Sequence, residues 1–216
     1  MKDAQEISVI VVGAGPAGLT AAVTLAEANV PTVLIGKRPM RPDNRTTALL
    51  ASSVTALRTL GAWDVCAQHA APLRVMRIVD DTGRLWRAPE VKFDAAEIGL
   101  DAFGHNIENR HLVTALEQKA RTLPSLRMVD GEAAAFEFGA HDVTVRLKDG
   151  ASLKAPLIIG ADGRKSHVHD AAGITIKERH YPQSALTVCL AHSRPHRDTS
   201  TEFHSSSGPF TLVPLP

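Results

Sequence analysis

The sequence predicts an α/β protein built on a parallel, doubly wound sheet and followed by a β-rich segment. Residues 7–12 form a short apolar, β-branched run, and residues 13–18 are rich in glycine. A second apolar run at 32–35 completes a βαβ unit of about thirty residues, the usual size of a right-handed crossover. Strands that are apolar throughout are typical of a parallel sheet covered on both faces.

Length, charge and cysteine content exclude several classes of protein. The chain has 216 residues, 44% hydrophobic and 22% charged, which is enough for one large or two small cores. Lysine and arginine number 24 against 23 acidic residues, so no basic surplus indicates nucleic acid as a partner. Cys66 and Cys189 lie far apart and are expected to be free thiols in a reducing compartment, which favours a cytoplasmic location.

Residues 7–26 carry no charge and are as long as a transmembrane helix. Three glycines and Pro16 interrupt this stretch, and the residues before it lack the basic flank of a secretory signal. We therefore expect a buried strand, a turn and a helix over about 16–29.

The middle of the chain predicts two more helices and a hairpin. Apolar residues recur at helical spacing over 50–60, and another helix is expected after Asn109. Residues 73–88 have apolar clusters on both sides of Asp80-Asp81-Thr82-Gly83, which is typical of a hairpin turn. We interpret 72–102 as a β-rich insertion.

Further strands are expected in the second half of the chain. Residues 134–138 and 143–147 predict an antiparallel pair, followed by a type I′ turn at Asp149-Gly150. Residues 157–160 predict a return to a buried strand. Beyond Gly173 the composition shifts to histidine, proline and serine. We expect a first domain over 1–173, and over 174–216 the start of a β-rich second domain that the chain leaves incomplete.

The most informative motif is Gly13-Ala14-Gly15-Pro16-Ala17-Gly18, which lies between a predicted strand and a predicted helix. Gly13 permits a tight turn, Gly15 lets the backbone approach a pyrophosphate, and Gly18 allows the helix to pack on the sheet. This context predicts a dinucleotide site at the positive end of the helix. A P-loop is excluded because Leu19 stands where the phosphate-binding lysine is needed.

The second strand of such a site normally ends in a carboxylate that binds the ribose hydroxyls. This chain has Gly36 there, followed by Lys37 and Arg38. The favoured interpretation is the loss of a replaceable contact, and a glutamate at Gly36 is then expected to strengthen FAD binding. The alternative is a preference for a 2′-phosphate, with NADP as the nucleotide instead of FAD.

Several motifs occur in order along the chain and together point to one family. They are residues 11–22, Arg45-Thr46-Thr47-Ala48-Leu49, Leu60-Gly61-Ala62-Trp63, Glu108-Asn109-Arg110, Gly160-Ala161-Asp162-Gly163 with Ser166, and Gly208-Pro209-Phe210 with Val213-Pro214-Leu215. In these motifs the chain resembles the flavin-dependent aromatic hydroxylases, which are FAD-dependent monooxygenases, and in particular the ubiquinone-biosynthesis hydroxylases.

The resemblance implies a Rossmann-like FAD-binding domain over 1–173 and a substrate domain that begins at 174. The residues it implies as nucleotide contacts are Gly13, Gly15, Gly18, Arg45, Arg110, Asp162 and Gly163. The predicted cofactor-binding residues also include Pro16 and Ala17 of the glycine motif, and Lys37 and Arg38 of the 2′-phosphate alternative. Asp162 has a second interpretation as a helix cap. Two positions depart from the family: Gly36 replaces an acid, and His169 stands where an arginine is usual.

The resemblance also implies an activity, hydroxylation of a small phenolic substrate, for which a prenylated ubiquinone precursor is one candidate, with NAD(P)H and O2 as co-substrates. It suggests peripheral association with a membrane or a biosynthetic complex. The alternatives are a flavin-dependent reductase or dehydrogenase, and a catalytically silent nucleotide-binding fragment. We expect residues 1–216 alone to be inactive, name no catalytic side chain, and expect no metal site, because the histidines lack partners at ligand spacing.

Overall fold

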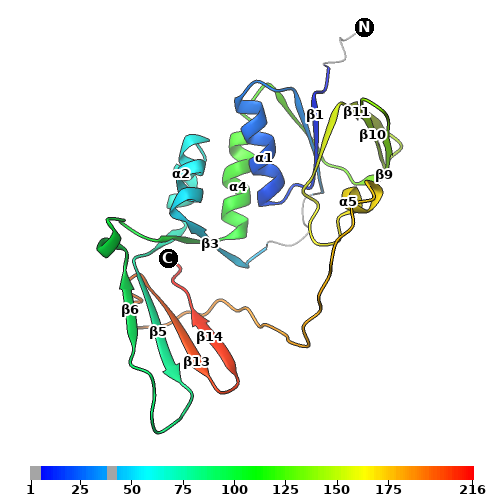
Figure 1. Ribbon diagram of the computed structural model, residues 1–216. Coiled ribbons are helices and arrows are strands. Elements are labelled where there is room, and N and C mark those ends of the chain that lie inside the picture. The colour runs from blue at the N-terminus through cyan, green and yellow to red at the C-terminus, as the bar shows by residue number, and fades with distance from the viewer. Residues whose placement is uncertain (1–5, 38–42) are drawn as a thin grey trace. The chain divides into compact units, whose positions relative to one another are not determined.

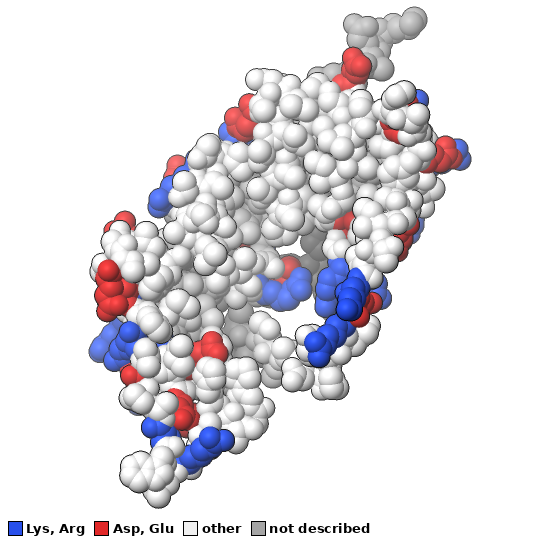
Figure 2. Space-filling view, viewed as in Figure 1, with Lys and Arg blue, Asp and Glu red and all other residues white. Residues whose placement is uncertain are grey.

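The computed structural model describes residues 6–37 and 43–216 (Figure 1). Its contacts divide the chain into two compact units. The first unit contains the described residues up to 37 together with 112–186, and the second contains 43–111 with 187–216. Charged side chains of both signs are scattered over the face shown in Figure 2, as expected from the near balance of basic and acidic residues.

The first unit is built on a parallel sheet. Its strands are β1 (Val9–Val12), β2 (Thr32–Ile35), β8 (Leu126–Val129) and β12 (Leu157–Gly160), in the order β12-β1-β2-β8. All three pairings are parallel, as the βαβ pattern predicted for β1 and β2. The carboxyl ends of the four strands therefore meet at one edge of the sheet.

Helices cover one face of this sheet. The helix α1 (Pro16–Glu27) packs on it through Leu19, Ala22, Val23 and Ala26, all buried. It ends two residues before the predicted Asn29, which has a φ of 60°. Figure 1 shows α4 (Asn109–Ala120) beside α1, and Lys119 Nζ lies 2.5 Å from Glu27 Oε1. The uncharged stretch therefore forms a strand, a turn and a helix, and no helix in the described residues is long and apolar enough to span a bilayer.

A small antiparallel sheet packs against the parallel one. It consists of β9 (Ala133–Phe138), β10 (Val143–Leu147) and β11 (Ser152–Ala155), in the order β11-β10-β9. Alternate residues of a strand point to opposite faces, and one buried cluster joins the two sheets. Its members are Ile10, Val12, Val33, Ile35, Val145, Leu147, Ala155 and Val168. The parallel α/β fold is thus confirmed, with helices on one side of the sheet and strands on the other.

The turn between β10 and β11 differs from the predicted type I′. That type needs positive φ at both central residues, but Gly150 has a φ of 90° and Asp149 is not among the residues with positive φ. The amide of Gly150 donates to Leu147 O at 3.0 Å. The pattern is a type I turn followed by a left-handed glycine, which resembles a three-residue hairpin loop.

The prediction of a buried strand at 157–160 is correct for the strand and wrong for its burial. In the order β12-β1-β2-β8, β12 is an edge strand of the described sheet. The side chain of Leu157 is 51% exposed, because this strand has a neighbour on one side only.

The second unit contains an antiparallel sheet packed on two helices. Its strands are β3 (Thr46–Leu50), β7 (Gly104–Glu108) and β4 (Ala70–Leu73), in the order β3-β7-β4. The helices are α2 (Ala51–Thr59), as predicted, and the short α3 (Trp63–Ala67). Buried residues of this unit include Val54, Leu57, Trp63, Cys66 and Ile107. Both cysteines are free, as predicted; Cys66 is buried and Cys189 is exposed.

The predicted hairpin exists, but its second strand begins later in the chain than the sequence predicts. β5 (Val75–Asp81) pairs antiparallel with β6 (Val91–Asp94), and Ile78 lies opposite Val91. The carboxylate of Asp80 accepts hydrogen bonds from the amides of Thr82 at 3.0 Å and Ala88 at 2.9 Å. These bonds hold a loop over 82–90, so residues 84–88 form no strand. The short 3₁₀ helix η1 (Ala95–Ile98) follows β6.

The last strands join this hairpin. β13 (Thr199–Ser205) pairs in parallel with β5 and antiparallel with β14 (Gly208–Leu212), which gives the order β14-β13-β5-β6. The predicted insertion at 72–102 therefore shares a sheet with strands of the predicted second domain. The domain boundary at 173 stays a prediction.

Candidate functional site

Two glycines of the motif are required by the packing of the protein itself. Gly13 follows β1 with a φ of 111°, and a Cβ there would lie 2.2 Å from Ala161 O. A Cβ on Gly18 would lie 1.8 Å from Gly13 O. Gly13 therefore forms the tight turn that the motif predicted, and this turn also packs closely against Ala161, which follows β12.

Gly15 has a different environment. A Cβ at this position would meet no atom within 4 Å, and the φ of −77° and ψ of 178° are open to any residue. Gly15 is the N-cap of α1, no side chain caps the helix, and the first turn carries no acidic residue. The positive end of a three-turn helix thus faces open space, an arrangement that suits an anionic ligand.

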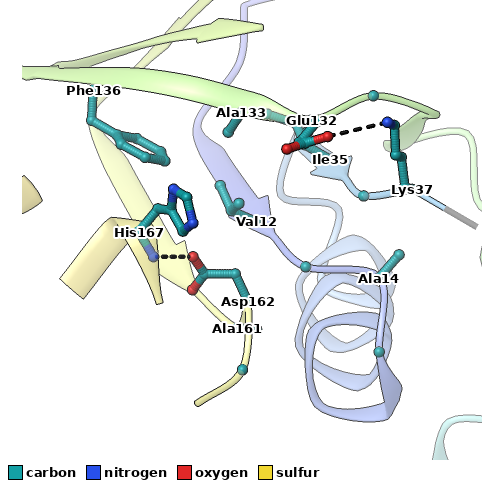
Figure 3. Close-up of a pocket in the computed structure, with 15 residues that line it drawn as sticks. Val12, Ala14, Ile35, Lys37, Glu132, Ala133, Phe136, Ala161, Asp162 and His167 are labelled. Carbon is teal, nitrogen blue, oxygen red and sulfur yellow. Dashed lines mark hydrogen bonds and ion pairs between the residues drawn. The ribbon is translucent and has the colours of Figure 1, made fainter. Parts of the chain in front are cut away.

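This open space is a pocket of about 380 Å³ at the carboxyl edge of the parallel sheet (Figure 3). Residues that follow β1, β2, β8 and β12 surround it, together with the first residues of β9 and of α5 (His167–Ala171). The lining consists of Val12, Gly13, Ala14, Gly15, Ile35, Gly36, Lys37, Gly131, Glu132, Ala133, Phe136, Ala161, Asp162, Gly163 and His167. Every one of these residues belongs to the first unit.

On one side of the pocket an acidic residue is held between two lysines. Lys37 Nζ lies 3.1 Å from Glu132 Oε2, and Lys148 forms an ion pair with Oε1 of the same carboxylate (Figure 3 shows the first of these). The hydrogen bonds from Lys148 and Lys37 lower the pKa of Glu132. This carboxylate is therefore ionised at neutral pH.

On the other side Asp162 organises the start of α5. Its Oδ1 accepts a hydrogen bond from Ser166 Oγ at 2.5 Å, and its Oδ2 accepts from the amides of His167 at 2.7 Å and Val168 at 3.3 Å. Ser166 Oγ in turn accepts from the amide of His169 at 3.1 Å, as the N-cap of the helix. Asp162 lines the pocket and accepts hydrogen bonds from the first amides of α5, although the N-cap residue of this helix is Ser166.

The position where the family has an arginine is occupied by His169, whose side chain contacts that of the adjacent Asp170. Its Nδ1 lies 2.8 Å from Asp170 Oδ1. Its Nε2 is buried and has no hydrogen-bond partner in the described part of the chain. His169 is not among the residues that line the pocket.

Gly36 has no room for the missing acid. A Cβ here would lie 2.5 Å from the backbone nitrogen of Ala14 and 2.5 Å from its Cβ. This packing argues against the expectation that a glutamate at Gly36 strengthens FAD binding, because the side chain would collide with the glycine turn. Lys37 and Arg38 are the residues that the alternative interpretation assigns to a 2′-phosphate. Lys37 is already paired with Glu132, and Arg38 lies outside the described residues.

Arg45 and Arg110 belong to the second unit, where each is paired with an acid. Arg45 donates from Nε and Nη2 to the two oxygens of Asp43, both at 2.8 Å, and Asn109 Nδ2 donates to the same carboxylate at 2.9 Å. The bond from Arg45 holds the pKa of Asp43 well below its usual range. Arg110 Nε donates to Glu108 at 2.7 Å. That these arginines contact a flavin nucleotide stays a prediction.

Among the pocket residues that sequence reasoning missed, three have large side chains: Glu132, Phe136 and His167. The signal that leads to Glu132 is β8, a strand that the sequence analysis did not identify. His167 belongs to none of the motifs identified in the sequence, and no group of three or more potential metal ligands occurs in the described residues.

The chain matches a known family and several curated proteins. Residues 6–214 match the family described as FAD binding domain. A ubiquinone hydroxylase, UbiL of Rhodospirillum rubrum, is 32% identical over 96% of this chain and 49% of its own length. The 3-demethoxyubiquinol 3-hydroxylase of Escherichia coli is 31% identical over 98% of this chain and 55% of its own. The chain thus spans about half the length of these relatives.

Solved structures support the same fold. The match to PqsL of Pseudomonas aeruginosa in complex with 2-aminobenzoylacetate has a TM-score of 0.76 at 21% identity, and covers 98% of this chain and 58% of PqsL. The match to HpxO of Klebsiella pneumoniae complexed with FAD and uric acid has a TM-score of 0.70 at 21% identity, and covers 97% of this chain and 53% of HpxO.

Proposed function

The chain belongs to the FAD binding domain family, and we propose that it holds FAD in the pocket at the carboxyl edge of the parallel sheet. The observation that carries this proposal is the contrast within the glycine motif. At Gly13 and Gly18 the space that a Cβ would need is occupied by the protein's own atoms, whereas the corresponding space at Gly15 is open. The protein itself does not need a glycine at position 15, but a pyrophosphate that approaches the backbone does.

The residues present fit the nucleotide half of FAD. The uncapped start of α1 offers a positive end to the pyrophosphate. The pocket continues from Gly15 to Gly36 and Lys37, the place where parallel nucleotide-binding sheets hold the adenosine ribose. Asp162 and Gly163 close the opposite side. We propose that the backbone of the Asp162 turn contacts the cofactor, since the Asp162 carboxylate is engaged in capping α5.

We propose that the whole protein is a monooxygenase that hydroxylates an aromatic substrate. The names of the curated relatives favour a phenolic, prenylated ubiquinone precursor as the substrate and a place in ubiquinone biosynthesis. The described residues of the pocket would bind and orient the nucleotide half of FAD, and the bound cofactor would supply the redox chemistry, with NAD(P)H and O2 as co-substrates. A cytoplasmic location, with peripheral association to a membrane or a biosynthetic complex, belongs to the same proposal.

Cofactor selectivity tests the first step of the proposal. The purified chain is freed of bound flavin and titrated with FAD, FMN and riboflavin while flavin fluorescence is followed. We expect FAD to bind far more tightly than FMN, because FMN lacks the adenylate half that the pocket accommodates. Equal affinity for FAD and FMN would contradict this assignment of the pocket.

The proposed activity needs its own measurement. NAD(P)H oxidation by the whole protein is followed with a series of phenols under ¹⁸O2. The products are examined by mass spectrometry, and we expect one ¹⁸O atom to be incorporated. A flavin-dependent reductase would instead oxidise NAD(P)H without an oxygenated product, and it would continue to do so when O2 is replaced by an artificial electron acceptor.

A further inference from the structure

We infer that Glu132 supplies the carboxylate that binds the adenosine ribose hydroxyls, in place of the residue that β2 lacks. The inference rests on the proposed function, because it concerns the same nucleotide pocket. It names a specificity-determining residue that follows β8, whereas parallel nucleotide-binding sheets normally carry this carboxylate at the end of the second strand.

Position 36, directly after β2, has no room for a side chain. Gly36 follows Ile35 at the point where the ribose carboxylate is expected, and a Cβ there would come within 2.5 Å of the Ala14 backbone nitrogen. A carboxylate for this region must therefore come from a neighbouring element.

The topology of the sheet brings Glu132 to this place. β2 pairs in parallel with β8, so that Ile35 lies beside Val129, and the Gly36 amide donates to Val129 O at 3.1 Å. Glu132 follows β8 by three residues and lines the same pocket as Gly36. In Figure 3 its carboxylate and the Lys37 ammonium face each other across the ends of the two strands.

The carboxylate has capacity left for a ligand. Lys37 donates to one of its oxygens and Lys148 to the other, whereas an ionised carboxylate has about four acceptor positions. The side chain is 37% exposed, so the remaining positions are not buried in the protein. The two lysines hold it in place and keep it ionised, which strengthens the hydrogen bonds it accepts from hydroxyl groups.

The same arrangement has a consequence for nucleotide choice. A 2′-phosphate would place its negative charge beside the Glu132 carboxylate. Lys37 is the one lysine or arginine among the described residues that line the pocket, and it is already paired with that carboxylate. The pocket therefore favours a ribose with free hydroxyls, as in FAD, over a 2′-phosphorylated one.

The experiment compares ligands that differ only in the hydroxyls. Calorimetry gives the dissociation constants of ADP and of 2′,3′-dideoxy-ADP for the wild type, for Glu132→Ala and for Glu137→Ala. Glu137 is the matched control, because it lies on β9, pairs with Arg146 at 2.7 Å and does not line the pocket. We expect ADP to bind about ten- to a hundredfold more tightly than the dideoxy compound in the wild type and in the control.

In Glu132→Ala the difference between the two ligands should fall to about twofold or less, since alanine accepts no hydrogen bond. Adenosine 2′,5′-bisphosphate should at the same time gain affinity relative to AMP, because Lys37 is released. A loss of affinity that is equal for ADP and the dideoxy compound would mean that Glu132 only supports the fold, and would overturn the inference.

The outcomes separate this inference from the proposed function. If the wild type binds FAD and ADP but the hydroxyl effect is the same in Glu132→Ala, only the inference fails. If the wild type binds neither FAD nor ADP, the proposed function fails and takes the inference with it.

Discussion

Gly36 lies against Ala14 so closely that a Cβ on Gly36 would be 2.5 Å from the Ala14 backbone nitrogen. The end of β2 is thus packed directly on the turn that begins α1. Two segments of the nucleotide pocket support each other here, and a side chain at Gly36 would push them apart.

We predict that Gly36→Glu destabilises the first unit and does not strengthen FAD binding. Overpacking of this kind typically costs about 1–3 kcal/mol. Urea unfolding followed by circular dichroism measures the loss, and flavin fluorescence measures affinity. Gly36→Ala serves as the companion variant, because it adds the Cβ without the charge. Native stability together with tighter FAD binding in Gly36→Glu would contradict the packing seen at this position.

Gly15→Val should abolish FAD binding and leave the fold intact. A Cβ at Gly15 meets no atom of the protein, so the free chain tolerates the substitution, whereas the valine methyl groups would occupy the space of the pyrophosphate. The control is Thr24→Val, which introduces the same side chain at an exposed position of α1. FAD titration and thermal unfolding are compared for both. A folded Gly15→Val protein with unchanged affinity would place the pyrophosphate elsewhere.

Gly18→Ala should lower the stability of the fold without blocking the pocket, whereas Gly15→Val should do the reverse. Its Cβ would lie 1.8 Å from Gly13 O, so that α1 must move away from the turn. We expect a loss of about 1–3 kcal/mol in the free energy of unfolding, measured in urea without any ligand. Any loss of FAD affinity should follow from this loss of structure. A fully stable Gly18→Ala protein would show that the turn has more freedom than its geometry suggests.

The local parts of the fold could be predicted because their signals are local. Residues 7–18 contain a strand, a glycine turn and a helix start within one short stretch, and the structure places them as expected. The burial of β12 was not predictable from its composition, because LIIG has the same apolar composition at the centre of a sheet and at its edge. Position in the sheet depends on pairings between distant segments.

The site was predictable only where it is made of the glycine motif. Glu132 is close to Gly36 because β8 pairs with β2, and the four residues of β8 contain Arg127 and show no clear periodicity. Glu132 has no basic neighbour in the sequence, and Lys37 and Lys148 reach it only through the fold, so the sequence does not distinguish it from the other carboxylates. The crowding of Gly36 by Ala14 is likewise a property of the folded turn.

Asp162→Ala should destabilise the start of α5. The carboxylate accepts hydrogen bonds from Ser166 Oγ and from the amides of His167 and Val168, and removal of such a cap usually costs about 0.5–2 kcal/mol. Asp170→Ala is the control, since Asp170 is an exposed carboxylate of the same helix that contacts the His169 ring, whereas the amides of His167 and Val168 donate to Asp162. Urea unfolding compares the two variants. An equal effect in both would mean that the capping bonds contribute little to stability.

Stability should fall as the pH is lowered below 6.5, and His105 should be one cause. Its ring packs edge-on against Trp63 with centroids 5.0 Å apart, and its Nδ1 is buried without a partner among the described residues. Burial, followed by the charges of Arg58 and Arg74, lowers the pKa of His105 below its usual 6.5.

As the pH falls below 6.5, His105 is protonated in the unfolded chain while it is still neutral in the folded chain. The free energy of unfolding therefore decreases until the pH reaches the lowered pKa of His105 in the folded chain. Urea unfolding between pH 5 and 8 should show this slope in the wild type and a smaller slope in His105→Phe, whose ring fits beside Trp63 and does not titrate. Part of the slope should remain, because burial also lowers the pKa of His111. Replacement of the exposed His141 by glutamine is the control, and an equal reduction of the slope there would remove His105 from the explanation.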